Sequence, residues 1–323
     1  MAEPVASILT LDDGIAAVDT EYMRPNMDAS HLIVEGGRAA FVDTGANSSV
    51  PFLLDALRQF DLDVGDVDYV FVTHVHLDHA GGAGLLMQHL PNARAVLHPR
   101  GARHMIDPSK LIAGTEAVYG KEQAYAMYGT IQPIEEGRVV IAEDEDRFDL
   151  NGREFQALHT EGHARHHYVL NDPASRGVFT GDSFGISYRD LDTDSGYFIY
   201  PTTTPIDFDP AEAHVSIDRI MACEPAHVYL THYSKVDGLD RLADDMHRDI
   251  DAFVALADRV EHDEDRLASL ETGMFEHWWQ RLQAHGYEGS RDDAFGIVEM
   301  DVKLNSMGLD VWLTRRAKAA SQN

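Results

Sequence analysis

The sequence predicts an α/β fold that carries a helical C-terminal appendage. The first observation behind this prediction is that short apolar runs of strand length alternate with amphipathic helical segments over residues 5–235. Second, several of these runs end in polar residues and glycine, where an α/β sheet presents its chemistry. Third, only helical periodicity remains after Gly238. We therefore expect a catalytic domain at residues 1–237 and a helical extension at residues 238–323.

Apolar runs and turn signals give the expected elements in chain order. Asp13-Gly14 and Asn151-Gly152 are dipeptides typical of tight turns between antiparallel strands. Asp209 followed by Pro210 predicts the start of a helix. The expected strands span residues 5–11, 15–20, 31–34, 39–42, 67–72, 93–98, 139–142, 148–158, 168–170, 177–182 and 226–230. The expected helices span residues 51–60, 85–90, 210–223, 242–256, 267–285 and 298–317.

Two segments interrupt this alternation. Residues 108–128 are helix-prone and rich in tyrosine, so they either wall a substrate pocket or pack as ordinary helix, and packing is the simpler interpretation. Residues 184–209 form a long loop rich in aromatic residues, and loops of that length are often functional. Its aromatic side chains either line an apolar pocket or hold the loop down. On the first interpretation Phe184 and Tyr188 contact substrate, together with Tyr233 beyond the last expected strand.

Composition and charge limit the expected partners and location. The net charge is −29, so the surface repels phosphate backbones and nucleic acid is not expected as a partner. Adaptation to salt and a codon bias towards Arg and Asp account equally well for that charge. No apolar run approaches the ~20 residues that cross a bilayer, so no membrane contact is expected. Met1-Ala2-Glu3-Pro4 lacks the features of a signal peptide, and Cys223 has no second cysteine to pair with; we expect a cytoplasmic protein, which could dimerise through its helical tail.

The densest cluster of potential metal ligands follows the expected strand 67–72. The stretch is Thr-His-Val-His-Leu-Asp-His-Ala-Gly-Gly, in which His74, His76, Asp78 and His79 fall within six residues. A period of two in extended chain puts the first two imidazoles on one side. Nitrogen and carboxylate donors at this spacing suit a dinuclear metal site better than a run of solvated surface histidines.

Three more candidate ligands lie at or beside the ends of later strands. They are His163, in the loop before strand 168–170; Asp182, at the end of strand 177–182; and His232, after strand 226–230. This shared position predicts that they converge with the first cluster at one edge of the sheets. The stretch 159–167 holds four histidines, which cannot all bind metal, and we assign no role to His159 or His166.

With these motifs the chain resembles the metallo-β-lactamase superfamily, in its glyoxalase II-like branch of dinuclear hydrolases. The motifs are the stretch 73–82, Thr-Glu-Gly-His at 160–163, Thr-Gly-Asp-Ser at 180–183 and Thr-His-Tyr at 231–233, and the resemblance covers residues 5–235. It implies a four-layer αββα sandwich with the metals at one edge. It also implies that the first metal is held by His74, His76 and His163, the second by Asp78, His79 and His232, with Asp182 bridging both and with Asp43 and His167 outside the ligand shell.

The implied chemistry is hydrolysis by a hydroxide shared between two divalent ions. Zinc is the first choice, with iron or manganese as alternatives. The hydroxide attacks an acyl carbon, with Asp78 orienting it and Asp182 or a bound water protonating the leaving group. We expect a small-molecule ester, lactone or thioester as substrate. Glutathione is not favoured, because Glu161 and His166 depart from the usual pattern and Arg315-Arg316 is too short a basic motif.

Other functions in the same superfamily are the alternatives. A mononuclear iron persulfide dioxygenase is the main one. A flavodiiron reductase fits less well, because that group has Glu in place of His76 and carries a flavodoxin domain. Phosphodiester cleavage is disfavoured by the negative charge. A non-catalytic binding protein is disfavoured because all seven expected ligand positions are intact.

Overall fold

The computed structural model describes residues 4–321, which form two compact units. The first unit comprises residues 4–159, 166–181 and 224–237, and the second comprises 160–165, 182–223 and 238–321. The second unit thus contains the helical tail and two segments from the first 237 residues. The domain boundary at 237/238 stays a prediction. Residues 1–3, which contribute to the expectation of a cytoplasmic protein, lie outside the described residues.

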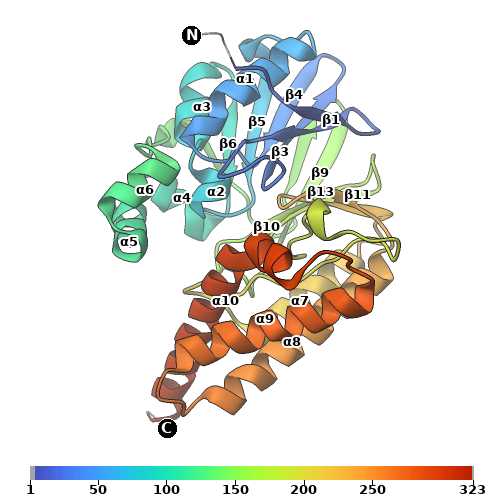
Figure 1. Ribbon diagram of the computed structural model, residues 1–323. Coiled ribbons are helices and arrows are strands. Elements are labelled where there is room, and N and C mark those ends of the chain that lie inside the picture. The colour runs from blue at the N-terminus through green and yellow to red at the C-terminus, as the bar shows by residue number, and fades with distance from the viewer. Residues whose placement is uncertain (1–3, 322–323) are drawn as a thin grey trace. The chain divides into compact units, whose positions relative to one another are not determined.

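The first sheet belongs to the first unit and has the strands in chain order (Figure 1). Its strands are β1 (Ile8–Thr10), β2 (Ile15–Asp19), β3 (Ala29–Glu35), β4 (Arg38–Val42), β5 (Val67–Val72), β6 (Arg94–Leu97) and β7 (Val139–Ile141). Strands β1 to β4 pair antiparallel, whereas β4 to β7 pair parallel. The carboxyl ends of β4, β5 and β6 therefore meet at one edge, which is where the first ligand cluster begins.

The second sheet also lies in the first unit, in the order β13-β12-β11-β10-β9-β8. Its strands are β8 (Arg147–Leu150), β9 (Arg153–His159), β10 (Tyr168–Asp172), β11 (Gly177–Gly181), β12 (His227–Leu230) and β13 (Ser234–Val236). The expected strand 148–158 is divided at the predicted turn, where Asn151 and Gly152 have φ of 51° and 94°. Strands β11 and β12 are parallel, so residues just beyond both point to the same edge.

Helices cover one face of the first sheet, and the second sheet covers the other. The helices of this unit are α1 (Val50–Gln59), α2 (Leu77–Ala80), α3 (Ala83–His89), α4 (Pro99–Ile106), α5 (Ser109–Tyr119) and α6 (Lys121–Tyr128). Helices α1, α3 and α4 pack against strands of the first sheet, whereas α5 and α6 pack mainly against each other. Leu53 of α1 and Leu86 of α3 are buried in one cluster with Val70 of β5. Phe71, the next residue of β5, is buried in a second cluster with Phe155 and Phe179 of the second sheet. Alternate side chains of β5 thus point to opposite faces of the sheet and contribute to both cores.

The second unit is built from four helices and the long loop. The helices are α7 (Pro210–Met221), α8 (Leu239–Val260), α9 (Arg266–His285) and α10 (Arg291–Ala320). The loop is bonded to the tail: the Tyr200 hydroxyl donates to Asp301 at 3.2 Å, and the Thr203 hydroxyl donates to the Asn305 carbonyl at 2.9 Å. A Cβ at Gly308 would lie 1.4 Å from the Thr203 carbonyl oxygen, so only glycine lets loop and helix approach this closely.

The predicted mixed α/β fold with a helical C-terminal region is confirmed. Several helix predictions were incomplete. Helices α2 and α4 were not predicted, and α8 is longer than the expected span 242–256. Helix α10 begins at Arg291 instead of 298, because Ser290 and Asp293 form a capping box. Within residues 4–321 none of the helices has the length and apolar character that crossing a bilayer requires.

Candidate metal centre

The end of β5 and the short helix α2 bring the first four predicted ligands together. His74 and His76 leave β5 in extended chain, and their Nε2 and Nδ1 atoms lie 2.9 Å apart. His76 is the N-cap of α2, whose first turn carries Asp78 and His79. A Cβ at Gly82 would lie 2.7 Å from the Ala46 carbonyl oxygen, so the glycine lets this turn pack against the loop after β4. The motif therefore serves both as ligand source and as tight turn.

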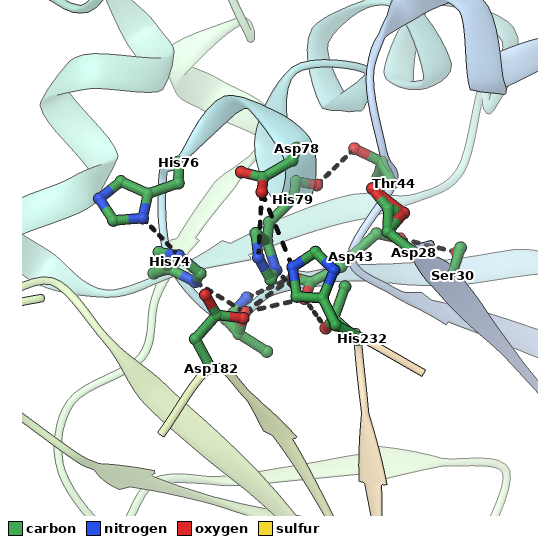
Figure 2. Close-up of polar contacts among 12 residues, drawn as sticks. Asp28, Ser30, Asp43, Thr44, His74, His76, Asp78, His79, Asp182 and His232 are labelled. Carbon is green, nitrogen blue, oxygen red and sulfur yellow. Dashed lines mark hydrogen bonds and ion pairs between the residues drawn. The ribbon is translucent and has the colours of Figure 1, made fainter. Parts of the chain in front are cut away.

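Asp78, His79 and His232 form a group of three donors within the first unit (Figure 2). Their ligand atoms all lie within 4.8 Å of one another. The Asp78 Oδ2 atom is 4.0 Å from Nε2 of His79 and 3.7 Å from Nε2 of His232. His232 follows β12, and so a residue more than 150 positions away in sequence reaches the α2 turn.

The outer nitrogens of both imidazoles are held by acceptors. His79 Nδ1 lies 2.7 Å from Asp43 Oδ2, and His232 Nδ1 lies 2.9 Å from the Met27 carbonyl oxygen. A proton on each Nδ1 leaves the Nε2 lone pair facing Asp78. This is the arrangement in which a metal-ligating histidine donates its other N–H to a carboxylate or carbonyl. The donor set, two imidazoles and one carboxylate, fits a divalent ion such as zinc.

Asp43 organises the buried side of this group. It lies at the end of β4 with φ of 58° and is fully buried. Besides His79, its carboxylate accepts hydrogen bonds from the Thr73 amide at 2.8 Å and from the Thr231 hydroxyl at 2.8 Å. These donors come from β5 and β12, so Asp43 ties both ligand-bearing segments to the end of β4. The resemblance placed Asp43 outside the ligand shell, but the sequence did not indicate its contact with Thr231.

Two histidines that directly precede β10 lie beside His74. The ring of His167, predicted to lie outside the ligand shell, stacks on His74 with centroids 4.8 Å apart. His166, to which no role was assigned, lies with its ring centroid 5.7 Å from that of His76. The Val75 amide donates to His166 Nδ1 at 3.4 Å. The signal for His166 was present in the four-histidine stretch, but sequence alone did not say which of the four faces the ligands.

His159, the other unassigned histidine, lies away from this group, beside His98. Their ring centroids are 4.1 Å apart, and His159 Nε2 lies 2.9 Å from the Ala142 carbonyl oxygen. Burial, with a smaller contribution from His159, lowers the pKa of His98 to about 3. His98 is therefore a neutral ring that packs against His159 between the two sheets.

Asp28 is a buried carboxyl that the sequence analysis missed. It is fully buried, and its Oδ1 accepts a hydrogen bond from the Thr20 hydroxyl at 2.6 Å. Burial raises the pKa of Asp28 to about 7, although the nearby His232 opposes that shift. No motif marks Asp28, because it follows a loop with no periodicity and is buried only through tertiary packing.

The other two predicted ligands, His163 and Asp182, lie together in the second unit. His163 Nε2 is 3.5 Å from Asp182 Oδ2, and His163 Nδ1 is hydrogen-bonded to the Thr202 hydroxyl. Phe184 and Tyr188 are buried in the same unit. Tyr233 is buried in the first unit. The substrate-binding role of these three residues stays a prediction.

Helices α5 and α6 line two pockets in the first unit. An open groove of about 880 Å³ is lined by Tyr22 and Tyr119, among others, and a smaller pocket of about 220 Å³ includes Leu77 and Tyr128. Burial raises the pKa of the Tyr119 phenol, and the charge of Asp78 adds to that shift. None of the α5 residues is buried, whereas Ala124 and Tyr128 of α6 are. Residues of both helices line these pockets, and a substrate-binding role of the segment stays a prediction.

Comparisons with known proteins agree with this geometry. The model of the metallo-beta-lactamase superfamily matches residues 24–232. A metallo-beta-lactamase fold-containing protein of Sulfurisphaera tokodaii is 30% identical over 171 residues, which are 51% of this chain and 60% of that protein. An atrochrysone carboxyl ACP thioesterase of Paecilomyces divaricatus is 25% identical over 248 residues, 75% of this chain and 62% of the thioesterase. The chain thus spans about 60% of the length of these relatives.

A solved structure shows the same fold. An archaeal metallo-beta-lactamase superfamily protein from Sulfolobus tokodaii is similar with a TM-score of 0.63 and 21% identity. The similarity covers 93% of this chain and 99% of that structure, so it extends into the C-terminal helices.

Proposed function

The chain belongs to the metallo-beta-lactamase superfamily, and we propose that it is a metal-dependent hydrolase of an ester-like bond in a small molecule. One observation carries the proposal: Asp78, His79 and His232 converge while the outer nitrogen of each imidazole is already held by an acceptor. Such preorganisation orients the ligands before an ion arrives. Histidines that merely packed or faced solvent would not need it.

We infer a centre of two divalent ions, zinc first. The proposed ligands of one ion are His74, His76 and His163, those of the other are Asp78, His79 and His232, and Asp182 bridges the two. Chain connectivity supports including the residues of the second unit. Asp182 directly follows Gly181 of β11, and His163 is three residues before His166. Since consecutive Cα atoms are only about 3.8 Å apart, this short separation along the chain supports the proposal.

Each carboxylate of the proposed site then has a distinct task. When bound, two divalent ions would lower the pKa of water to about 7 and so make hydroxide available near neutral pH. Asp78 keeps one oxygen to orient the attacking water. Asp43, already bonded to Thr73 and Thr231, fixes the His79 ring and stabilises the positive charge around it. Asp182 carries a proton towards the leaving group.

The pockets of the first unit favour an uncharged, apolar or aromatic acyl group. Tyr22 and Tyr128 stack with centroids 5.8 Å apart, and each lines one of the two pockets. Leu77 of the smaller pocket is adjacent in sequence to Asp78. A side chain of the substrate lying against these rings would be held next to the ligand group. A thioester is the first choice, because a relative that aligns with 75% of this chain is named a thioesterase.

The test is metal analysis of the purified protein combined with a substrate panel. We expect about two divalent ions per chain, and hydrolysis of a thioester, an aryl ester or a lactone but not of a phosphodiester. Asp182→Ala should lose one ion and most activity while its circular dichroism spectrum stays unchanged. Asp194→Ala, an exposed aspartate of the same segment, should behave as wild type.

One result would overturn the proposal. A protein that holds a single iron, takes up oxygen in the presence of a thiol and hydrolyses none of the esters would be the redox alternative. Full activity of Asp182→Ala would remove that residue from the site.

A further inference from the structure

A second group of histidines and aspartates lies on α7 and α8, both in the second unit, where the two helices pack against each other (Figure 1). His214 and Asp218 are four residues apart on α7, and His247 and Asp251 are four apart on α8. Residues at this spacing share one face of a helix. Each helix therefore presents one imidazole and one carboxylate to the other.

The four side chains form a continuous row. The Nδ1 atoms of His214 and His247 are 2.6 Å apart, with the two ring planes only 8° from parallel. At the outer ends, His214 Nε2 lies 3.3 Å from Asp251 Oδ1, and His247 Nε2 lies 3.3 Å from Asp218 Oδ1. Each histidine thus pairs with the carboxylate of the opposite helix.

This pairing favours one arrangement of the ring protons. With a carboxylate oxygen 3.3 Å from Nε2 of each ring, a proton on each Nε2 would put the lone pairs of both rings on Nδ1. Two lone pairs facing each other at 2.6 Å repel unless a positive charge lies between them. The negative charges of the two carboxylates would stabilise such a positive charge further. A shared proton or a metal ion can supply it.

We propose that His214 and His247 bind a divalent transition-metal ion through their Nδ1 atoms, at a site separate from the catalytic centre. A carboxylate on the outer nitrogen is the usual support of a metal-ligating histidine, and both rings have one. Imidazole donors suit zinc, nickel or copper. The histidine side chains are 30% and 29% exposed, which leaves room for water to complete the coordination.

Binding there would fasten α7 to the C-terminal helices. Helix α7 also supports the loop that carries His163. The Ser216 hydroxyl donates to the Glu161 carbonyl, and the Asp209 amide donates to the Gly162 carbonyl at 2.8 Å. An ion between α7 and α8 therefore stabilises the part of the second unit in which a predicted catalytic ligand lies.

Zinc titration of the full-length protein, with the catalytic centre already loaded, tests this site. We expect one further ion per chain by isothermal titration calorimetry and a melting temperature that rises with zinc. His214→Gln and His247→Gln should each lose both effects and keep the hydrolytic activity. His262→Gln, an exposed histidine beyond α8, should keep both effects.

A variant that retains both nitrogen donors separates metal binding from packing. Asp251→Asn should weaken zinc binding about 10- to 100-fold without abolishing it. In one outcome the wild-type protein takes up no further ion and its melting temperature does not change with zinc. That would show that the two rings share only a proton. A further ion that persists in both histidine variants would place it elsewhere. Either result overturns the proposal, and neither depends on whether the protein is a hydrolase.

Discussion

The two units position their proposed ligands in different ways. In the first unit, His74 to His79 and His232 follow directly on buried strands, and Asp43 bonds to the segments that carry them. In the second unit, His163 is bonded to Thr202 of a loop, whose next residue bonds to α10. One set of ligands is placed by the regular geometry of strand ends. The other is placed by contacts between segments about 100 residues apart.

Mutations in the first unit should therefore affect chemistry, whereas mutations in the helical tail should mainly affect stability. A change at the strand ends alters ligand orientation directly, because the Asp43 carboxylate contacts the His79 ring. A change in the helical tail first loosens the loop and reaches the chemistry only through it. Variants in the two units should distinguish these two routes.

The largest effect is expected at Asp43. Asp43→Asn keeps the shape of the side chain but removes the negative charge that holds His79. Replacing such an orienting carboxylate typically costs 10- to 100-fold in metal affinity or activity. We expect the upper end, about 100-fold, because the amide of Asn keeps only one of the two acceptor oxygens that now serve Thr73, Thr231 and His79. Competition with a chelator and steady-state kinetics measure both. Asp237→Asn, an exposed aspartate of the same unit, is the control; equal metal affinity in the two variants would contradict the assignment.

The second prediction concerns pH and the core of the first unit. Burial lowers the pKa of His31 from 6.5 to about 4. The folded state therefore binds fewer protons than the unfolded state in this window, and stability present above pH 6.5 is lost as the pH falls towards 4. At about 1.4 kcal/mol per pKa unit this amounts to about 3 kcal/mol. Urea unfolding of His31→Leu should show that much less acid destabilisation than wild type or His262→Gln. Identical pH profiles would be inconsistent with a buried neutral His31.

The third prediction uses two glycines of α10. A methyl group at Gly308 would collide with the Thr203 carbonyl, whereas the space around Gly296 is open. Gly308→Ala should therefore destabilise the protein by about 2 kcal/mol, since overpacking costs 1–3 kcal/mol. Gly296→Ala should stabilise it by about 1 kcal/mol through helix propensity. Chemical denaturation gives both values. Two variants of equal stability would mean that the loop does not depend on α10.

The smallest effect is expected in the pocket of the first unit. Tyr119→Ala removes a wall of the groove without touching a proposed ligand. We expect KM to rise about 10-fold at an unchanged kcat, the signature of lost uniform binding. Val215→Ala on α7, an exposed apolar position, should leave both constants unchanged. A fall in kcat alone would place Tyr119 in the chemistry instead of the pocket.

The sequence predicted most of what local rules determine. The strand pattern, the turn at Asn151-Gly152 and the start of α7 at Pro210 all depend on neighbouring residues, and the structure has them. The ligand cluster of α2 was visible because its donors are close together in the chain. His232 could be proposed only because it follows an expected strand, a position that it shares with other candidate ligands.

What was missed depends on tertiary packing. Asp28 has no sequence signature, and its raised pKa arises from burial by segments far along the chain. His166 could not be distinguished from His159, because the direction of each ring is decided only when the two sheets pack. The pocket wall of α5 and α6 looked like ordinary helix, since periodicity does not show which faces remain uncovered. The pairing of α7 with α8 was equally invisible.

The most direct test of the proposed centre of two ions is anomalous X-ray diffraction at the zinc edge from crystals of the loaded protein. We expect two strong peaks about 3.5–4 Å apart. One should be coordinated by Asp78, His79 and His232, the other by His74 and His76, and both should lie within bonding distance of Asp182. A single peak bound only by residues of the first unit, with His163 and Asp182 out of reach, would contradict it.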